Sequence, residues 1–201
     1  MRQWETSANP ARRRQFDLCR ALVIDLEATC WQGPRPASEE PEIIEIGNAI
    51  LNTADLRVEP GPEILVRPTC STISPFCTEL TGITQEMVDE RGLPFVEALG
   101  VLRETPGDLT RMAWASYGEY DRRKLNEACQ RCCVPFPLGN THLNVKRLVA
   151  LAAGWVREDG MSGAMRRLGV QPIPGSRHHR GCDDAANIAT MLGVLFRGLR
   201  A

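Results

Sequence analysis

The sequence has no hydrophobic run long enough to cross a membrane, since a membrane-spanning helix needs roughly 20 consecutive apolar residues. Residues 1–17 are polar, include three consecutive arginines from Arg12, and lack the apolar core of a signal peptide. We therefore expect a cytoplasmic protein that does not associate with membranes.

The eight cysteines lack the partners that a structural zinc site would need. Cys129, Cys132 and Cys133 have the spacing of half a site, but no second pair of Cys or His stands at zinc-finger spacing. A disulfide framework is not expected either, because there is no export signal and the hydrophobic content of 43% is ordinary. We expect free thiols in a reducing compartment.

Lysine is scarce, so arginine supplies nearly all of the positive charge. The net charge is only −1, but residues 1–110 carry 10 basic and 18 acidic side chains, whereas residues 111–201 carry 14 and 7. A guanidinium can hold a phosphate group by two parallel hydrogen bonds. The asymmetry indicates a polyanionic ligand on the C-terminal half; the alternative is an arginine-rich composition without a functional meaning.

The 201 residues are enough for one domain with a full core, and they contain no repeat, low-complexity tract or linker. Short connections between predicted strands at 20–27, 42–52 and 63–67 favour antiparallel neighbours. Helices and strands alternate afterwards, which predicts an α/β fold with a central mixed five-stranded sheet flanked by helices. We expect residues 1–17 to form a flexible arm and residues 18–201 to form a single domain.

The remaining predicted elements follow from hydrophobic periodicity and from Pro, Gly and capping residues. The predicted strands lie at 111–117 and 142–145. The predicted helices lie at 74–82, at 84–92, from 94 to the break at 106–107, at 120–133, through 148–152, at 160–168 and at 183–199.

Two acidic residues follow a short apolar strand, Ala21 to Ile24. Strand side chains alternate between faces, so Asp25 and Glu27 point the same way, roughly 6.6 Å apart along the backbone. Two adjacent carboxylates are costly unless a cation lies between them. The pair indicates a metal site; the alternative is two solvated acids at the end of a strand.

Further acids stand where other strands end and helices begin. Asp121 follows the predicted strand at 111–117, and Asp183 and Asp184 open the last helix, just after His178 and His179. Each acid alone could be a simple helix cap. In a twisted α/β sheet, however, ligands collect where strand ends meet helix starts. Four carboxylates with a nearby histidine fit a two-metal hydrolytic centre, and hard oxygen ligands select Mg²⁺ or Mn²⁺.

The sequence resembles the DEDD-type 3′–5′ exonucleases of the ribonuclease H-like superfamily. Three motifs carry the resemblance: Asp25-Leu-Glu27, Tyr117-Gly-Glu-Tyr-Asp121 and His179-Arg-Gly-Cys-Asp-Asp184. The histidine five residues before the last aspartate is typical of the DEDDh branch. Residues 25–31, 42–46 and 74–84 are similar to the ERI-1-like subgroup, whose eukaryotic members are exoribonucleases. The resemblance extends over roughly residues 20–198.

The resemblance implies a set of residues that hold two Mg²⁺ or Mn²⁺ ions, with His179 as the general base. The implied metal ligands are Asp25, Glu27, Asp121 and Asp184. His178 and Asp183 have the same separation as His179 and Asp184, so they form an alternative pair.

The resemblance also implies a pocket for the terminal nucleotide. Backbone groups of Ala28 and Thr29 would contact the terminal ribose. The side chains implied to line the base pocket are Leu80, Thr81 and Ile83. For Leu80 and Ile83 the alternative is a place in the hydrophobic core. The candidates for phosphate contacts are Arg180, Arg122, Arg123 and Arg177, for which a solvated surface is the alternative.

We therefore expect an enzyme that hydrolyses phosphodiester bonds from the 3′ end of single-stranded RNA or short oligonucleotides and releases 5′-mononucleotides. The first alternative is a 3′–5′ DNA exonuclease of the proofreading or repair type, because the catalytic motifs do not distinguish the sugar. A nucleic-acid-binding module without catalysis is the least favoured alternative, since a pure binder has no use for clustered carboxylates beside phosphate.

Overall fold

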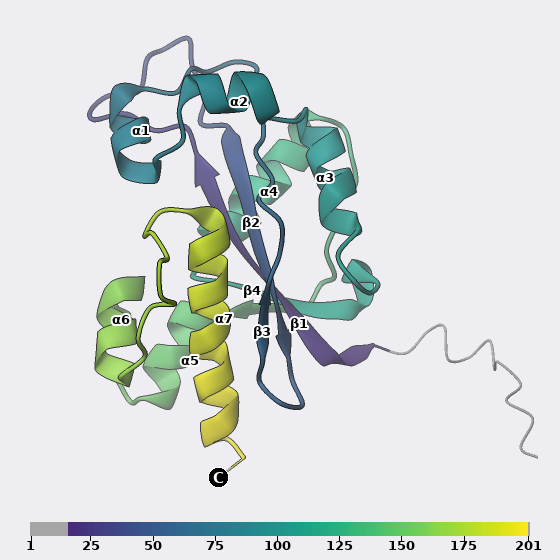
Figure 1. Ribbon diagram of the computed structural model, residues 1–201, viewed down its shortest axis with the longest axis vertical. Helices are drawn as coiled ribbons and strands as arrows, with labels where there is room; N and C mark the ends of the chain where they lie inside the picture. The colour runs from purple at the N-terminus through teal and green to yellow at the C-terminus, as the bar shows by residue number, and fades with distance from the viewer. Residues whose placement is uncertain (1–15, 201) are drawn as a thin grey trace, which may run out of the picture.

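A computed structural model describes residues 16–200 and places a five-stranded sheet at the centre of the protein (Figure 1). The strands are β1 (Asp17–Ala28), β2 (Ile43–Asn52), β3 (Val58–Pro60), β4 (Met112–Ser116) and β5 (His142–Asn144). Their order across the sheet is β3-β2-β1-β4-β5. The pairs β1–β2 and β2–β3 are antiparallel, whereas β1–β4 and β4–β5 are parallel. The predicted mixed sheet is confirmed.

The predicted strand at 63–67 is misplaced. The third strand of the sheet is instead Val58–Pro60, and Leu65 forms only an isolated bridge to Glu45 of β2. Pro62, which lies between the two segments, has no N–H to donate to a neighbouring strand. The edge of the sheet is therefore interrupted, and the chain pairs with β2 in two short pieces.

Each predicted helix is present among the described residues. The helices are α1 (Pro75–Thr81), α2 (Gln85–Arg91), α3 (Phe95–Arg103), α4 (Tyr120–Arg131), α5 (Val145–Ala152), α6 (Met161–Leu168) and α7 (Gly181–Gly198). The last helix begins two residues earlier than predicted. The ends of α1 show why the sequence signals worked: the Ser74 side chain accepts a hydrogen bond from the N–H of Cys77, and Gly82 ends the helix with a φ of 73°.

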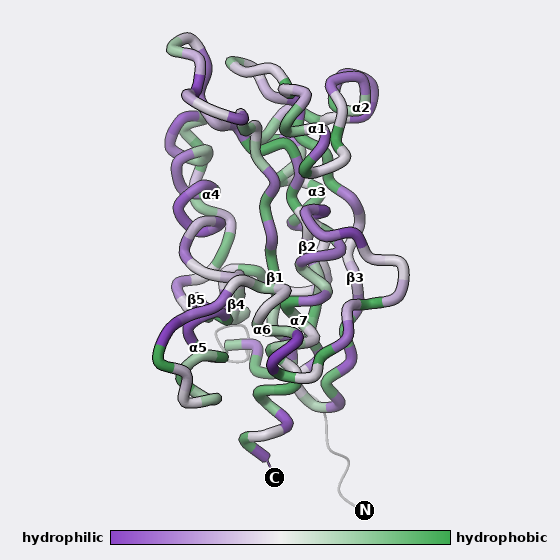
Figure 2. Tube along the Cα trace, turned by 90° about the vertical axis from the view of Figure 1, so that its left-hand side faces the viewer, coloured by the Kyte–Doolittle hydropathy of each residue, from purple (hydrophilic) through white to green (hydrophobic). Residues whose placement is uncertain are grey.

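Helices cover both faces of the sheet. Along β1, Leu22, Ile24 and Leu26 pack into one cluster with residues of α3 and α4, whereas Ala21 and Val23 pack into a second cluster with α5, α6 and α7. In Figure 2, hydrophobic residues run along the central strands, and α4 is hydrophilic on the side that faces away from the sheet. The protein therefore has three layers, with the sheet in the middle.

Asp25 and Glu27 continue the face of β1 that Ala21 and Val23 begin, because side chains two residues apart lie on the same face of a strand. This is the face that α7 covers. Figure 1 shows that the start of α7, together with α1 and α2, lies at the end of the sheet toward which β1 points. The layer order therefore aims both carboxylates at the first turn of α7.

Two hydrophobic side chains of these helices are at the surface: Val96 is 48% exposed and Leu151 is 72% exposed. Both lie on helices too short for the apolar stripe to be sharply defined. Most of the predicted N-terminal arm, residues 1–15, lies outside the described residues, and Asp17 is the first residue of β1. None of the described helices combines the length and the apolar character that a bilayer span requires.

Candidate active site

Carboxylates from three elements meet in one cleft at the end of β1. Asp25 and Glu27 come from β1, and Asp184 comes from the first turn of α7; one oxygen from each lies within 4.8 Å of the others. Asp121, in the first turn of α4, lines the same cleft, which has a volume of about 310 Å³. The structure thus brings together the four acids that the sequence motifs select, although they are spread over most of the chain.

The start of α7 reaches the sheet because two glycines lie against each other. Gly47 of β2 is the register partner of Asp25, and a Cβ atom added to Gly47 would lie 1.8 Å from the carbonyl carbon of Gly181. The N–H of Gly181 donates a 3.0 Å hydrogen bond to Oε2 of Glu45, which is fully buried. These contacts fix the first turn of α7, and with it Asp184, beside the carboxylates of β1.

The acids repel one another in a partly dry environment. Burial, followed by repulsion from Asp184, raises the pKa of Glu27 to about 8. Burial raises the pKa of Asp121 to about 6, and burial followed by repulsion from Asp121 holds the pKa of Asp25 well above its usual value. The pKa of Asp184 is also raised by burial, although the N–H of His179 opposes the shift. A cluster of close, buried carboxylates fits a divalent cation with hard oxygen ligands.

Asp121 is held in place by the backbone of β1. Its Oδ1 accepts a 2.9 Å hydrogen bond from the N–H of Leu26, between the two acids of the first motif. The carboxylate is therefore oriented before any ligand arrives.

The loop before α7 brings two histidines to Asp184. The N–H of His179 donates to Oδ2 of Asp184 over 2.9 Å, and Nδ1 of His178 lies 3.1 Å from the same oxygen. The two imidazole rings stack with 4.0 Å between their centres. His179 has a φ of 64°, which is uncommon for a residue with a side chain. Burial, and then the neighbouring His178, lower the pKa of His179.

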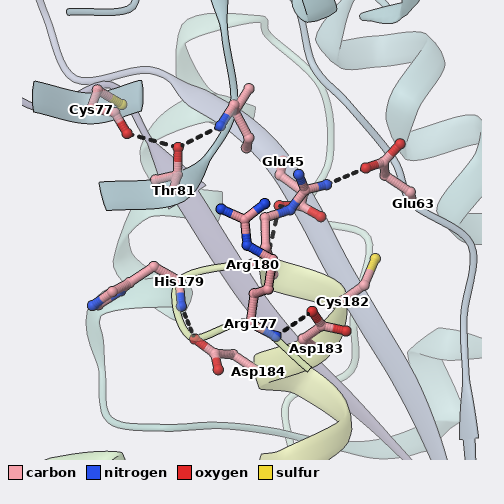
Figure 3. A network of polar contacts seen from close by, with 12 residues as sticks. Glu45, Glu63, Cys77, Thr81, Arg177, His179, Arg180, Cys182, Asp183 and Asp184 are labelled. Carbon is pink, nitrogen blue, oxygen red and sulfur yellow. Dashed lines mark hydrogen bonds and ion pairs between the residues drawn. The ribbon is translucent and has the colours of Figure 1, made fainter. Parts of the chain in front are cut away.

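Asp184, and not Asp183, turns into the cleft. Oδ2 of Asp183 accepts a 2.8 Å hydrogen bond from the N–H of Arg177, and the Asp183 carboxylate points away from that of Asp184 (Figure 3). This placement favours the pair of His179 and Asp184 that the sequence analysis preferred. His178 nevertheless lines the cleft too, a position that the sequence signalled only through the alternative register.

Arg180 is engaged in ion pairs beneath the cleft, so its placement does not support the expected phosphate contact. Its guanidinium lies 3.4 Å from Oε2 of Glu45 and also pairs with Glu63 (Figure 3). The Arg180 side chain is only 15% exposed. Because a buried carboxylate such as Glu45 requires compensation, the arginine is drawn to it.

Leu80 and Ala28 line the cleft as expected, and Leu80 is 38% exposed. The placement does not support the expectation that Thr81 and Ile83 also line it. The Thr81 hydroxyl donates to the carbonyl of Cys77 and accepts from the N–H of Ile83, and both residues are buried under α1. Helical spacing turns Leu80 outward and its neighbour Thr81 inward.

Thr29 is buried beside the cleft and not in its wall. Its Oγ1 accepts a 2.9 Å hydrogen bond from the N–H of Glu42, and its own N–H donates to the carbonyl of Glu42. Both the side chain and the N–H of Thr29 are thus used to join the end of β1 to β2.

Sequence reasoning did not assign several residues that line the cleft. They are Cys30, Tyr117, Tyr120 and Met161. The two tyrosines stand inside the second motif, so their aromatic character beside Asp121 was the available signal. Met161 opens α6, and no feature of the sequence pointed from that helix to the cleft.

The family model described as exonuclease (RNase_T) matches residues 22–192. The chain belongs to the exonuclease family. Within this family it is similar to human ERI1 exoribonuclease 3, with 31% identity over 88% of this chain and 54% of the relative. It is also similar to human 3′–5′ exoribonuclease 1, with 33% identity over 83% of this chain and 49% of the relative. The exonuclease chain spans about half the length of these curated relatives.

Solved structures agree with this assignment. The nuclease domain of 3′hExo, a DEDDh family member bound to rAMP, has a TM-score of 0.73 and 28% identity, covering 90% of this chain and 92% of that one. A 3′-exonuclease that recognises the 3′ end of a histone mRNA stem-loop has a TM-score of 0.78 and 26% identity, covering 92% of this chain and 65% of that one. The resemblance to the DEDDh exonucleases of the ERI-1-like kind is confirmed.

Proposed function

We propose that this protein is a 3′–5′ exoribonuclease that removes 5′-mononucleotides from the 3′ end of single-stranded RNA or short oligonucleotides. One observation carries the proposal: four carboxylates from β1, α4 and α7 meet beside His179 in a single cleft of an exonuclease-family fold. The relatives named as exoribonucleases support RNA as the substrate.

We infer that Asp25, Glu27, Asp121 and Asp184 would hold two divalent cations. Oxygen-only ligands favour Mg²⁺ or Mn²⁺ over softer metals. When bound, such cations supply positive charge that offsets the charge of the phosphodiester and of its departing 3′ oxygen.

His179 takes the proton of the attacking water through its imidazole ring. An imidazole with an ordinary pKa of about 6.5 is mostly unprotonated above neutral pH and can act as a base. The bond from its N–H to Asp184 fixes the backbone of the loop, so the ring is held at the cleft. Leu80 offers an apolar surface for the terminal base, and the backbone at Ala28 lies beside the carboxylates where a ribose would stand.

An assay with matched 5′-labelled RNA and DNA oligonucleotides, single- and double-stranded, tests the proposal. With Mn²⁺, the wild-type protein should shorten single-stranded RNA one nucleotide at a time from the 3′ end. The variants Asp25→Asn and Asp184→Asn should keep the fold, seen by circular dichroism, and lose this activity. Faster trimming of DNA than of RNA would replace the proposal by a DNA exonuclease, and unchanged cleavage in either variant would remove the site.

His179→Ala should lower the rate by roughly 10²–10⁴-fold if the ring is the base. His178→Ala is the matched control, because it removes the stacked neighbour. A larger loss in the control than in His179→Ala would exchange the two roles.

All eight cysteines are unpaired in the structure, which supports our proposal of a reducing, cytoplasmic compartment.

A further inference from the structure

A second and larger cavity lies next to the catalytic cleft, on the other side of Tyr120. Its volume is about 650 Å³, and Tyr120 lines both spaces. The cavity lies between the first turns of α4, the end of β4 and the edge strand β5. Its polar lining residues are His142, Glu119, Arg122, Arg123, Asn126 and Asn140. None of these residues belongs to the carboxylate cluster described above.

His142 lines this cavity, and one of its two ring nitrogens receives no hydrogen bond from the described residues. Oγ of Ser116 lies 2.9 Å from Nε2 of His142 and 3.1 Å from the carbonyl oxygen of Gly118. Both contacts are hydrogen bonds when the hydroxyl donates to Gly118 and accepts from Nε2, so we assign the ring hydrogen to Nε2. Burial lowers the pKa of His142, which favours the neutral ring, so Nδ1 carries a lone pair.

That lone pair is not used inside the protein. No residue that the structure describes donates a hydrogen bond to Nδ1 of His142. The nearest polar contact is Oε2 of Glu119 at 3.9 Å, and a carboxylate cannot donate. The His142 side chain is only 4% exposed. A ligand that brings an N–H or O–H group into the cavity would supply the hydrogen bond that Nδ1 lacks within the described residues.

The rest of the cavity suits a flat ring with a negatively charged group attached. Trp114 lies beneath His142, with 4.1 Å between the ring centres, and Phe136 packs against Trp114 at 5.9 Å. At the rim, the guanidinium of Arg122 is 56% exposed and that of Arg123 is 66% exposed, and their nearest acidic partners stand at 3.9 Å and 3.8 Å. Both arginines are thus able to turn toward a phosphate group.

We propose that this cavity is a second nucleotide-binding site of the protein. Nδ1 of His142 accepts a hydrogen bond from an N–H of the base or an O–H of the ribose, Phe136 and Tyr120 form the apolar walls, and Arg122 holds the phosphate. The proposal rests on the proposed function for the class of ligand. The nucleotide can belong to the bound nucleic acid, outside the cleaved residue, or can be a free mononucleotide; the chemistry of recognition is the same.

The ring nitrogens of the histidines report directly on this site. The chain has three histidines, so a long-range ¹H–¹⁵N spectrum of the metal-free protein in EDTA is simple to assign. We expect His142 as the Nε2–H tautomer, and we expect its Nδ1 signal to shift on addition of 5′-AMP. In Asn140→Trp, which fills the cavity from an exposed position, this shift should disappear while any shift of His178 or His179 remains.

Affinity measurements give the second readout. Arg122→Ala should weaken the binding of 5′-AMP at His142 roughly tenfold, which corresponds to about 1.4 kcal/mol, and should leave the binding of adenosine, which has no phosphate, unchanged. Arg131→Ala removes the same charge from the other end of α4 and should change neither value by more than about twofold. A single-stranded RNA of about 12 nucleotides and a hairpin of equal length then show which source of nucleotide reaches His142.

The Nδ1–H tautomer in the free protein, shifts confined to His178 and His179, or a His142 shift that survives in Asn140→Trp would each overturn the proposal. A shift caused by RNA supports a site for the nucleic acid, and a shift caused only by 5′-AMP supports a site for the free nucleotide. These readouts need no hydrolysis. Failure of the proposed function is seen separately, as the absence of Mn²⁺-dependent RNA trimming by the wild-type protein.

Discussion

Neutralising one acid of the cluster should stabilise the metal-free protein. Burial and repulsion raise the pKa of Glu27 from 4.5 to about 8, so the folded state binds a proton that the unfolded state releases. The corresponding stability is fully present below pH 4.5 and is lost as the pH rises through about 8. At about 1.36 kcal/mol per pKa unit, the loss between pH 5 and pH 8 is about 4 kcal/mol.

Glu27→Gln cannot ionise and should escape this loss. In EDTA at pH 8, its melting temperature should exceed that of the wild type by roughly 10 °C, since 1 kcal/mol shifts the midpoint by roughly 2–4 °C in a protein of this size. At pH 5 the two proteins should melt within a few degrees of each other. Glu59→Gln on β3 is the matched control, because Glu59 is exposed, and it should change the stability by less than about 0.5 kcal/mol.

Divalent cations should narrow the difference in stability between the two proteins at pH 8. Mn²⁺ at about 100 times its dissociation constant stabilises the folded state by about 2.7 kcal/mol. The wild type should gain this increment at pH 8, and Glu27→Gln, which lacks a ligand, should gain little. Scanning calorimetry measures the melting temperatures of both proteins at pH 5 and at pH 8, in EDTA and in Mn²⁺. A lower melting temperature of Glu27→Gln in EDTA at pH 8 would refute the repulsion on which this reasoning depends.

Three further substitutions test how the site is built. Gly47→Ala should cost roughly 1–3 kcal/mol of stability and abolish RNA trimming because it displaces the start of α7. Gly100→Ala is the control, because the added Cβ meets no neighbour, and it should change neither property. Thermal melting and trimming rates compare the two variants. Arg180→Ala should cost about 3–5 kcal/mol in denaturant unfolding because Glu45 is left buried and charged, and the added change Glu45→Gln should restore part of it. Hydrogen bonds from the backbone N–H groups of residues 69 and 70 lower the pKa of Glu42 despite its burial, so Glu42→Gln should lose about 2 kcal/mol at pH 7. Urea titrations should show this difference shrink as the pH falls below 4.5 and through the lowered pKa of Glu42.

The alternation of a strand was enough to predict the first half of the site. Asp25 and Glu27 share a face because side chains two residues apart always do, and the structure adds only that α7 covers this face. Likewise, helix signals such as Ser74 and Gly82 act within a few residues, so the boundaries of α1 could be predicted locally.

The expectations that the placement does not support depend on contacts between segments that are distant in the sequence. The ion pair of Arg180 could not be predicted because its partner Glu45 lies 135 residues earlier in the chain, in a strand whose register no local pattern specifies. Thr81 and Ile83 were expected in the pocket from the family resemblance, and no local pattern indicated that both are buried. The close approach of Gly47 to Gly181 has no sequence signal except the two glycines themselves.

Such long-range contacts are what allow the fold to hold mutually repelling acids close together. Two of the four carboxylates are anchored by a backbone N–H from another segment: Asp121 by Leu26 of β1 and Asp184 by His179 of the loop before α7. Neither of these two can turn to solvent without losing a hydrogen bond. The repulsion that remains is relieved when a cation binds, so the rigidity of the elements that carry the acids contributes to the affinity of the site for that cation.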